Sequence, residues 1–362
     1  MAMKRSGFRF GWIVGVAAVL VFAVAGTGMA ADYPTVDFVK KEFQTFPGKG
    51  KTVQPARASW TSGFILEAIY SRALEHLGYE VEKYKELSAP IFYKSLTYGE
   101  VDYWANGWFP LHEEQLPGNF EEMASKVGYV VKKGAVQGYL VSKKHAEQYD
   151  ITGLSDFKRK EVKEAFDANG DGKADLVACP PGWGCEQKIK HHLDVYDLRD
   201  HINPIKATYS ASMADAVARF NEGEPVLFYT WTPNWTVNRL VPGEDVVWIN
   251  VPEIKPTEGQ KPFVEYMTVS DLPGAVTDPI KLGFVPNDIR VAANQEFLDN
   301  NPGAKKLFEL MAVSFDDITA QNDKMYAGED KQEDIERHAT EWIQENKEQW
   351  IEWQRKARMA CE

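Results

Sequence analysis

The sequence predicts a two-lobed α/β fold in which each lobe is a mostly parallel sheet flanked by helices. Strand and helix patterns alternate along the chain, which is typical of parallel sheets covered on both faces. The sequence contains a weak internal repeat, formed by "SLTYGEVDYWANGWFP" and "ARFNEGEPVLFYTWTP". Each stretch has the end of a helix, Gly-Glu, a strand and a Trp-x-Pro. Roughly 330 residues remain behind an N-terminal export signal, enough for two domains.

Lobe 1 is predicted to begin with a strand–helix unit. Apolar residues recur at helical spacing over 64–77, and Gly78 ends this helix. A strand near 79–83 and a helix near 91–98 are expected to follow. Residues 32–46 precede the unit as an arm.

Two chain crossings are predicted to separate the lobes. "AVQGYLVSKKH" predicts a strand that leaves lobe 1, and "VVWINVPE" predicts the strand that returns. Lobe 1 then comprises residues 47–140 and 245–362, and lobe 2 residues 141–244, to within about ten residues. Two such crossings form a hinge, and hinged lobes close around ligands. The tail over 333–359 is predicted to be helical, with three packing tryptophans: Trp342, Trp350 and Trp353.

The N-terminus predicts export. Basic residues precede an apolar run over 11–25, and small residues follow it. This pattern is typical of a secretory signal peptide, here residues 1–30, cleaved after about Ala30. A membrane anchor is the alternative, but the apolar run is short for a span. We therefore expect a soluble protein of the periplasm.

The composition limits the partners. A net charge of −12 argues against nucleic acid and anionic membranes. Eleven tryptophans are more than packing alone requires, so some are expected to serve a ligand.

The stretch "CPPGWGC" holds Trp183 in a loop that prolines stiffen and two cysteines bound. Cys179 and Cys185 are predicted to form a disulfide, because exported proteins fold in an oxidising compartment. A thiol nucleophile at Cys185 fits export less well, and a zinc site lacks matching ligands. Cys361 is left as a free thiol near the C-terminus.

Aromatic residues are predicted to converge on one cleft. Trp108 and Trp231 each lie at the carboxyl end of a predicted strand, where ligands bind in open α/β sheets. Two lobes facing each other would place these rings across a cleft, with Trp183 presented by its loop. His112, four positions after Trp108, is expected to face the same space.

The same cleft is predicted to offer an anion site. "EQKIKHHLDVY" is helical in pattern, and the first amides of this helix, from Gly184 and Cys185, attract an anion. Aromatic faces attract quaternary ammonium groups, whereas a primary amine requires Asp or Glu. A betaine carries both a methylated ammonium and a carboxylate. Because an imidazolium is the better partner for an anion, bound betaine is expected to favour protonated His112.

Several motifs carry a family resemblance: "FDANGDGKADLVACPPGWGCE", "YTWTPNW", "WFPLH", "GAVQGYL" and "ALEHLGY". With them the chain resembles, from about Pro47 to Trp353, the periplasmic glycine betaine/proline betaine-binding proteins of ProU-type ABC importers. The resemblance implies the type II periplasmic binding protein fold and a site made of a tryptophan box and a carboxylate subsite: Trp108, Trp183, Trp231, His112, Gly184 and Cys185. It also implies a monomer without enzymatic activity or cofactor, which passes betaine to an inner-membrane permease and its ATPase for osmoprotection.

Other functions fit the sequence less well. A related methylated ammonium or sulfonium solute is the nearest alternative, and a glycan receptor would need more planar polar groups. A hydrolase would pair His112 with Glu113 or Cys185, but no nucleophile elbow is present. A metal site at His191 and His192 is disfavoured because adjacent helical residues face different ways.

"DANGDG" resembles the opening half of a calcium loop. Asp167, Asn169 and Asp171 occupy ligand positions, and Asp175 stands at the ninth. Position twelve is Ala178 where a bidentate Glu is expected. A structural Ca²⁺ and a simple surface turn therefore both remain open.

Overall fold

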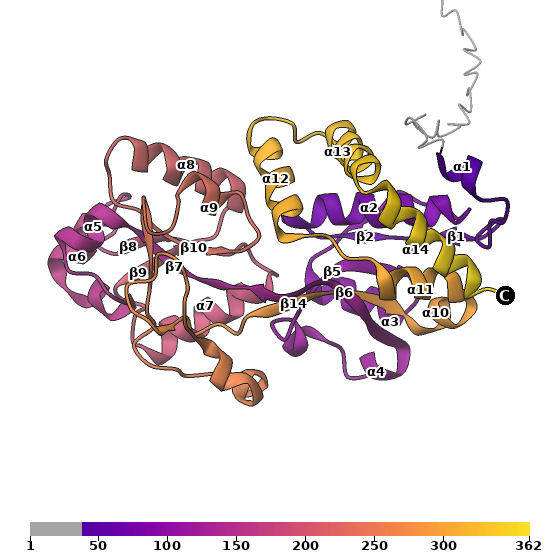
Figure 1. Cartoon of the computed structure of the whole chain (residues 1–362). Helices are drawn as coiled ribbons and strands as arrows, with labels where there is room; N and C mark the ends of the chain where they lie inside the picture. The colour runs from indigo at the N-terminus through magenta and orange to yellow at the C-terminus, as the bar shows by residue number, and fades with distance from the viewer. Residues whose placement is uncertain (1–37) are drawn as a thin grey trace, which may run out of the picture. The chain divides into compact units, whose positions relative to one another are not determined.

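The computed structural model of the protein describes residues 38–362 (Figure 1). The predicted signal peptide, its cleavage site and the start of the predicted arm lie outside the described residues. No helix within residues 38–362 is both long and apolar enough to cross a membrane.

The strands have the following bounds: β1 (Thr52–Val53), β2 (Ala56–Arg57), β3 (Glu80–Val81), β4 (Lys85–Glu86), β5 (Tyr103–Phe109), β6 (Ala124–Ala135), β7 (Gln137–Ser142), β8 (Ala174–Val177), β9 (Ile202–Ile205), β10 (Leu227–Trp231), β11 (Val246–Ile249), β12 (Thr268–Val269), β13 (Ile280–Lys281) and β14 (Asn287–Asn294). The α-helices are α1 (Phe38–Glu42), α2 (Ser62–His76), α3 (Ala89–Thr97), α4 (Phe120–Met123), α5 (Lys143–Gln148), α6 (Lys160–Ala165), α7 (Gly184–Val195), α8 (Tyr209–Asn221), α9 (Thr236–Arg239), α10 (Gln295–Asn300), α11 (Pro302–Leu310), α12 (Phe315–Tyr326), α13 (Gln332–Glu345) and α14 (Lys347–Met359). Among residues 38–362, the 3₁₀ helices η1 (Glu113–Gln115), η2 (Leu154–Lys158) and η3 (Glu258–Met267) lie in connections.

Lobe 1 is the part built on β14 and its neighbours. β14 pairs antiparallel with β5 on one side and with β6 on the other. The short pairs β1–β3 and β2–β4 are parallel, and a parallel bridge between Pro55 and Tyr103 joins them to β5. Every strand of this layer except β14 therefore runs in one direction.

Lobe 2 is built on a five-stranded sheet of order β11–β7–β10–β8–β9. β7 is antiparallel to both β10 and β11, whereas β8 is parallel to both β10 and β9. In each lobe, the one strand of opposite direction is the strand that arrives from the other lobe. The predicted mostly parallel sheets and the two crossings are thus confirmed.

The predicted place of the second crossing is wrong. Residues 246–249 form β11, which pairs with β7 and so lies in lobe 2 rather than at the start of the return to lobe 1. Backbone hydrogen bonds from Val276 to Trp248 and from Val251 to Lys281 keep the following segment on lobe 2. The chain returns only at β14. An apolar strand here covers the open edge of β7, and an uncovered edge would expose unpaired backbone groups.

The helices around lobe 1 agree with the sequence prediction. The helix expected over 64–77 is α2, after which Gly78 adopts a left-handed φ of +96°. α13 packs against α2, and α14 packs against α11 (Figure 1). The three tail tryptophans are buried, as predicted, and the indole N–H of Trp350 donates to His76 Nδ1 at 3.0 Å. The described part of the arm is tied to α14, where the Arg358 guanidinium lies 4.0 Å from the centre of the Phe43 ring.

Candidate functional site

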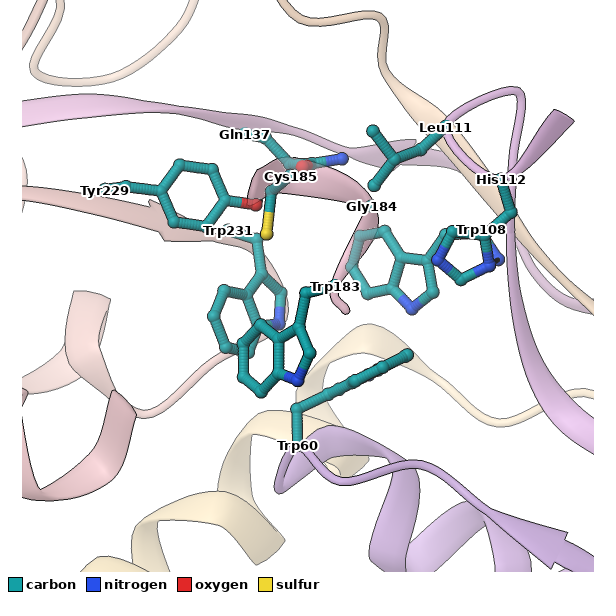
Figure 2. A pocket seen from close by; sticks show the side chains of 10 residues that line it. All are labelled: Trp60, Trp108, Leu111, His112, Gln137, Trp183, Gly184, Cys185, Tyr229 and Trp231. Carbon is teal, nitrogen blue, oxygen red and sulfur yellow. Dashed lines mark hydrogen bonds between the residues drawn. The ribbon is translucent and has the colours of Figure 1, made fainter. Parts of the chain in front are cut away.

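A pocket lies between the two lobes, and most of its wall is aromatic (Figure 2). The cavity between these side chains is narrow, with a volume of about 30 Å³. It is lined by Trp60, Trp108, Leu111, His112, Gln137, Trp183, Gly184, Cys185, Tyr229 and Trp231. No Asp or Glu stands among these lining residues. The wall therefore carries no acceptor charge for a primary ammonium group.

Strand ends deliver three of the four tryptophans. Trp108 is the penultimate residue of β5, Trp231 is the last residue of β10, and Trp60 follows β2. Trp183 is the residue that precedes the first turn of α7. Carboxyl ends of strands and amino ends of helices meet at the ligand edge of open α/β sheets, which explains the convergence.

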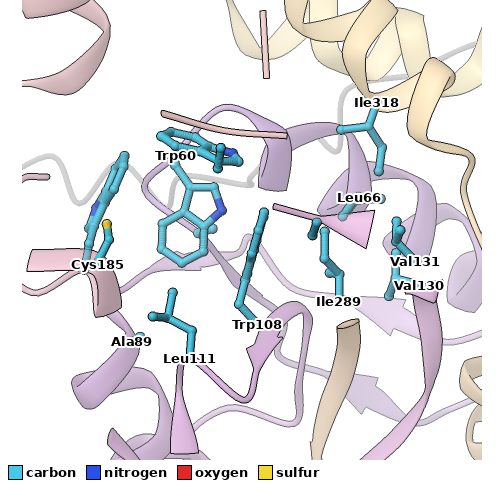
Figure 3. Close-up of a cluster of buried hydrophobic side chains, with 14 of the residues drawn as sticks. Trp60, Leu66, Ala89, Trp108, Leu111, Val130, Val131, Cys185, Ile289 and Ile318 are labelled. Atoms are coloured by element: carbon cyan, nitrogen blue, oxygen red, sulfur yellow. The ribbon is translucent and has the colours of Figure 1, made fainter. Parts of the chain in front are cut away.

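The indoles of lobe 1 share one anchor. The N–H groups of Trp60 and Trp108 both donate to Asn106 Oδ1, at 2.7 and 2.8 Å. All three side chains are buried, and Figure 3 shows both tryptophans within an apolar cluster that continues to Ile289. Their polar N–H groups are thus satisfied within the protein, and the ring faces are left for the pocket.

The indoles of lobe 2 are anchored across the pocket on lobe 1. Trp183 Nε1 donates to Ser59 Oγ at 3.0 Å, and Trp231 Nε1 donates to Ser62 Oγ at 3.4 Å. Both serines belong to the connection between β2 and the start of α2. The same connection holds Trp60, so one short segment of lobe 1 meets both rings of lobe 2.

The rings are arranged as walls rather than as a stack. The planes of Trp60 and Trp183 are inclined by 68°, with centroids 5.3 Å apart. Trp183 and Trp231 are inclined by 79° at 5.5 Å. Near-perpendicular neighbours surround a space with π faces from several directions, as an aromatic cage does.

The amino end of α7 forms the polar side of the pocket. Cys179 and Cys185 are joined by a disulfide, which confirms the predicted pairing. The N–H groups of Gly184 and Cys185 stand in the first turn of this twelve-residue helix, where no intrahelical acceptor exists. A Cβ at Gly184 would lie 2.9 Å from Leu111 Cγ, so only glycine allows this close approach.

His112 is buried and neutral. Its Nδ1 accepts hydrogen bonds from the Trp108 backbone N–H at 3.2 Å and from the Tyr93 hydroxyl at 2.9 Å. Burial lowers the pKa of His112 to about 3. The single ring proton therefore sits on Nε2, beside the Cδ2 edge that faces Gly184. In this structure the ring is neutral and Nδ1 is occupied as an acceptor, so the imidazolium expected with bound betaine stays a prediction.

Comparison with known proteins decides the family. The family model of the substrate binding domain of ABC-type glycine betaine transport systems matches residues 51–345. The chain belongs to this family. It is 40% identical over 317 residues to the glycine betaine-binding periplasmic protein OusX of Dickeya dadantii, covering 87% of this chain and 92% of that protein. It is 39% identical over 320 residues to the glycine betaine/proline betaine-binding periplasmic protein of Escherichia coli K12, with 86% and 92% covered.

Solved structures show the same fold. ProX from Borrelia burgdorferi aligns with a TM-score of 0.64 at 18% identity, covering 84% of this chain and 96% of that one. Lactococcal OpuAC, in its closed conformation with glycine betaine, aligns with a TM-score of 0.62 at 18% identity, covering 84% and 99%. At this identity the likeness concerns the fold, which is the predicted type II periplasmic binding protein architecture.

In this betaine-transport family member, the six predicted site residues all line the one pocket: Trp108, His112, Trp183, Gly184, Cys185 and Trp231. Sequence reasoning missed Trp60, Leu111, Gln137 and Tyr229. Trp60 gave only a weak signal, because it lies three residues after the two-residue strand β2. The other three had none that separates them from ordinary strand or turn residues.

The remaining candidates do not assemble into a second site. Glu113 pairs with Lys126 at 3.0 Å rather than with His112. His191 Nε2 is bonded to the Lys255 carbonyl at 2.8 Å, whereas the adjacent His192 points to the Tyr139 hydroxyl. Within residues 38–362, no cluster of three or more His, Cys, Asp or Glu side chains is placed to hold a metal ion.

The predicted calcium loop is closed by its own hydrogen bonds. Asp167 accepts the backbone N–H groups of Gly170 and Gly172, each at 2.8 Å. Asp175 accepts from the Asn169 side chain at 2.6 Å, and Asp171 accepts from Asn203 at 2.8 Å. A calcium ion would need these same carboxylate oxygens as ligands. Calcium binding at this loop stays a prediction.

Proposed function

We propose that this protein is the periplasmic substrate-binding protein of an ABC importer and captures glycine betaine or proline betaine. Its family is defined by a substrate binding domain of such transport systems, and the full-length relatives are named as periplasmic betaine-binding proteins. The observation that carries the proposal is the pocket itself: four indole faces at one end and hydrogen-bond donors at the other, with no carboxylate in the wall.

The aromatic end suits a quaternary ammonium group. Such a cation cannot donate strong hydrogen bonds, so it gains most from π faces and from the removal of its methyl groups from water. Trp108, Trp183 and Trp231 are the predicted box, and Trp60 adds a fourth face. At about 0.5–2 kcal/mol each, these contacts supply a large part of the roughly 8 kcal/mol of micromolar binding.

The polar end suits a carboxylate. The amides of Gly184 and Cys185 lie at the positive end of the α7 dipole, and His112 adds a neutral Nε2–H donor. Donors fixed in this way need no rearrangement when the ligand arrives. A ligand with a cationic head and an anionic tail therefore matches both ends of the pocket.

The cellular role follows from this site and from the export signal. Cleavage after about Ala30 would release a soluble monomer into the periplasm. There it would deliver betaine to an inner-membrane permease driven by an ATPase, and the cell would accumulate a compatible solute under osmotic stress. The protein itself would bind its ligand without chemical conversion.

Isothermal titration of the purified mature protein tests this function. The panel contains glycine betaine, proline betaine, a dimethylsulfonio carboxylate, choline, amino acids and sugars. We expect micromolar or tighter binding for the betaines, and weaker or no binding for amino acids and sugars. Binding of a sugar or an unmethylated amino acid ahead of the betaines would reject the proposal.

A further inference from the structure

Gln137 occupies a special place at the first crossing between the lobes. It is the first residue of β7, directly after the chain leaves lobe 1, and it pairs with Trp231 across the sheet. Only 1% of the residue is exposed, yet its side chain lines the betaine pocket. A polar side chain in this position needs partners for both its oxygen and its nitrogen.

The oxygen of the Gln137 amide has a partner, but the nitrogen has none. The Tyr229 hydroxyl donates to Gln137 Oε1 at 2.6 Å. Burial raises the pKa of Tyr229 well above its usual range, so the hydroxyl keeps its proton and remains a donor. Gln137 Nε2 is buried and makes no hydrogen bond in the protein. Leaving a buried N–H group unpaired is costly, which calls for a partner outside the described chain.

The direction of the free nitrogen identifies that partner. Figure 2 shows the Gln137 amide near Cys185, with its nitrogen turned toward Leu111 and away from Tyr229. It therefore stands on the side of the pocket where α7 begins. The backbone N–H groups of Gly184 and Cys185 lie at the same end, so all of these donors require an acceptor there.

We propose that Gln137 Nε2 is a further donor to the ligand's carboxylate, held in position by Tyr229. This inference rests on the proposed betaine function. A carboxylate offers about four lone-pair sites, and the pocket offers donors from Gly184, Cys185, His112 and Gln137. The set favours zwitterions with a carboxylate end over cations with a neutral end such as choline, because a neutral end leaves donors unpaired.

Two variants of Gln137 test the proposal by titration with glycine betaine and with choline. Gln137→Met keeps the size of the side chain and removes the donor. We expect glycine betaine to bind roughly ten- to hundredfold more weakly, as for a lost hydrogen bond to a charged group, with choline changed less than about threefold. Gln137→Glu replaces the donor with an acceptor. This variant is expected to bind glycine betaine still more weakly and to bind choline more tightly, so that the preference shifts toward choline.

A matched control separates this role from packing. Gln321 on α12 is also buried with an unpaired Nε2, but it does not line the pocket. Gln321→Met is expected to leave both affinities unchanged. Thermal unfolding without ligand checks that each variant is folded.

The results distinguish this inference from the function on which it rests. If the wild-type protein fails to bind glycine betaine, the proposed function itself is rejected. The role of Gln137 alone is overturned by either of two results with a wild type that binds glycine betaine. In the first, Gln137→Met binds glycine betaine as tightly as the wild type does. In the second, Gln137→Met loses affinity for glycine betaine and for choline by the same factor.

Discussion

Trp183 in lobe 2 and Ser59 in lobe 1 are joined by a hydrogen bond of 3.0 Å, although 124 residues separate them in the chain. The bond fixes an indole of the pocket wall to the opposite lobe. Trp231 is tied in the same way to Ser62, three residues further along the same segment. Two side chains of the aromatic cage are therefore held by hydrogen bonds between the lobes.

Removal of this link should weaken ligand binding through a faster release. Ser59→Ala leaves the Trp183 N–H without its partner, at a cost of about 1 kcal/mol, or roughly fivefold in Kd. Stopped-flow tryptophan fluorescence measures the dissociation rate, which we expect to rise by the same factor. An unchanged dissociation rate would show that the bond does not hold the closed state.

Trp60 should behave as a cage wall rather than as a packing residue. Trp60→Phe keeps a π face and is expected to cost about 0.5 kcal/mol in betaine binding, whereas Trp60→Leu should cost about 1–2 kcal/mol. Titration calorimetry compares the two variants. Trp342 is a buried tryptophan outside the pocket, and Trp342→Leu is the control that should lower stability without changing affinity. Equal affinities for the Phe and Leu variants at position 60 would contradict the role in the cage.

Loss of the disulfide should lower both the stability of the protein and its affinity for betaine. The bond closes a loop with a sequence separation of 6, so its entropic stabilisation is about 2 kcal/mol. Its cleavage frees the amides of Gly184 and Cys185 to move, and on the order of tenfold weaker betaine binding is expected from the lost preorganisation. Titration of the reduced protein gives the affinity. Thiol counting on the native protein should find one reactive group, the exposed Cys361, and a count of three would disprove the bond.

The buried His112 should make the protein sensitive to acid. Its pKa is about 3 in the folded state against about 6.5 in an unfolded chain, so the unfolded state takes up a proton first. The stability it contributes is fully present above pH 6.5 and falls as the pH drops toward 3. Between pH 7 and pH 5 the loss from this residue is about 2 kcal/mol.

Urea unfolding of wild type and His112→Gln at both pH values measures that loss. The decrease in the free energy of unfolding from pH 7 to pH 5 should be about 2 kcal/mol smaller in the variant. Identical decreases would mean that His112 titrates normally. Because the neutral ring already donates through Nε2 and bound betaine is expected to favour the protonated ring, betaine affinity should be no weaker at pH 5 than at pH 7.

The sequence predicted those parts of the site whose signals are local. Trp108 and Trp231 each lie at the end of a recognisable strand. Trp183 lies between glycines and cysteines, which predict a constrained loop. Trp60 was missed because β2 spans only Ala56–Arg57 and gives too short a pattern.

Features that depend on distant partners could not be predicted in this way. The role of Gln137 depends on Tyr229, 92 residues later in the chain. The neutral state of His112 depends on the Tyr93 hydroxyl and on burial, neither of which spacing reveals. The chain returns to lobe 1 only at β14 because β11 pairs with the free edge of β7 in lobe 2. The apolar sequence of a strand does not reveal which of two sheets the strand joins.

The central claim is that the cage recognises the positive charge of the ligand's trimethylammonium group. Titration with glycine betaine and with 3,3-dimethylbutanoate tests it most directly, because the second molecule has the same shape and the same carboxylate but a neutral carbon in place of the nitrogen. Three or four cation–π contacts predict that glycine betaine binds on the order of a hundredfold or more tightly than its uncharged counterpart. Equal affinities would contradict the account, since the pocket would then recognise shape and carboxylate alone.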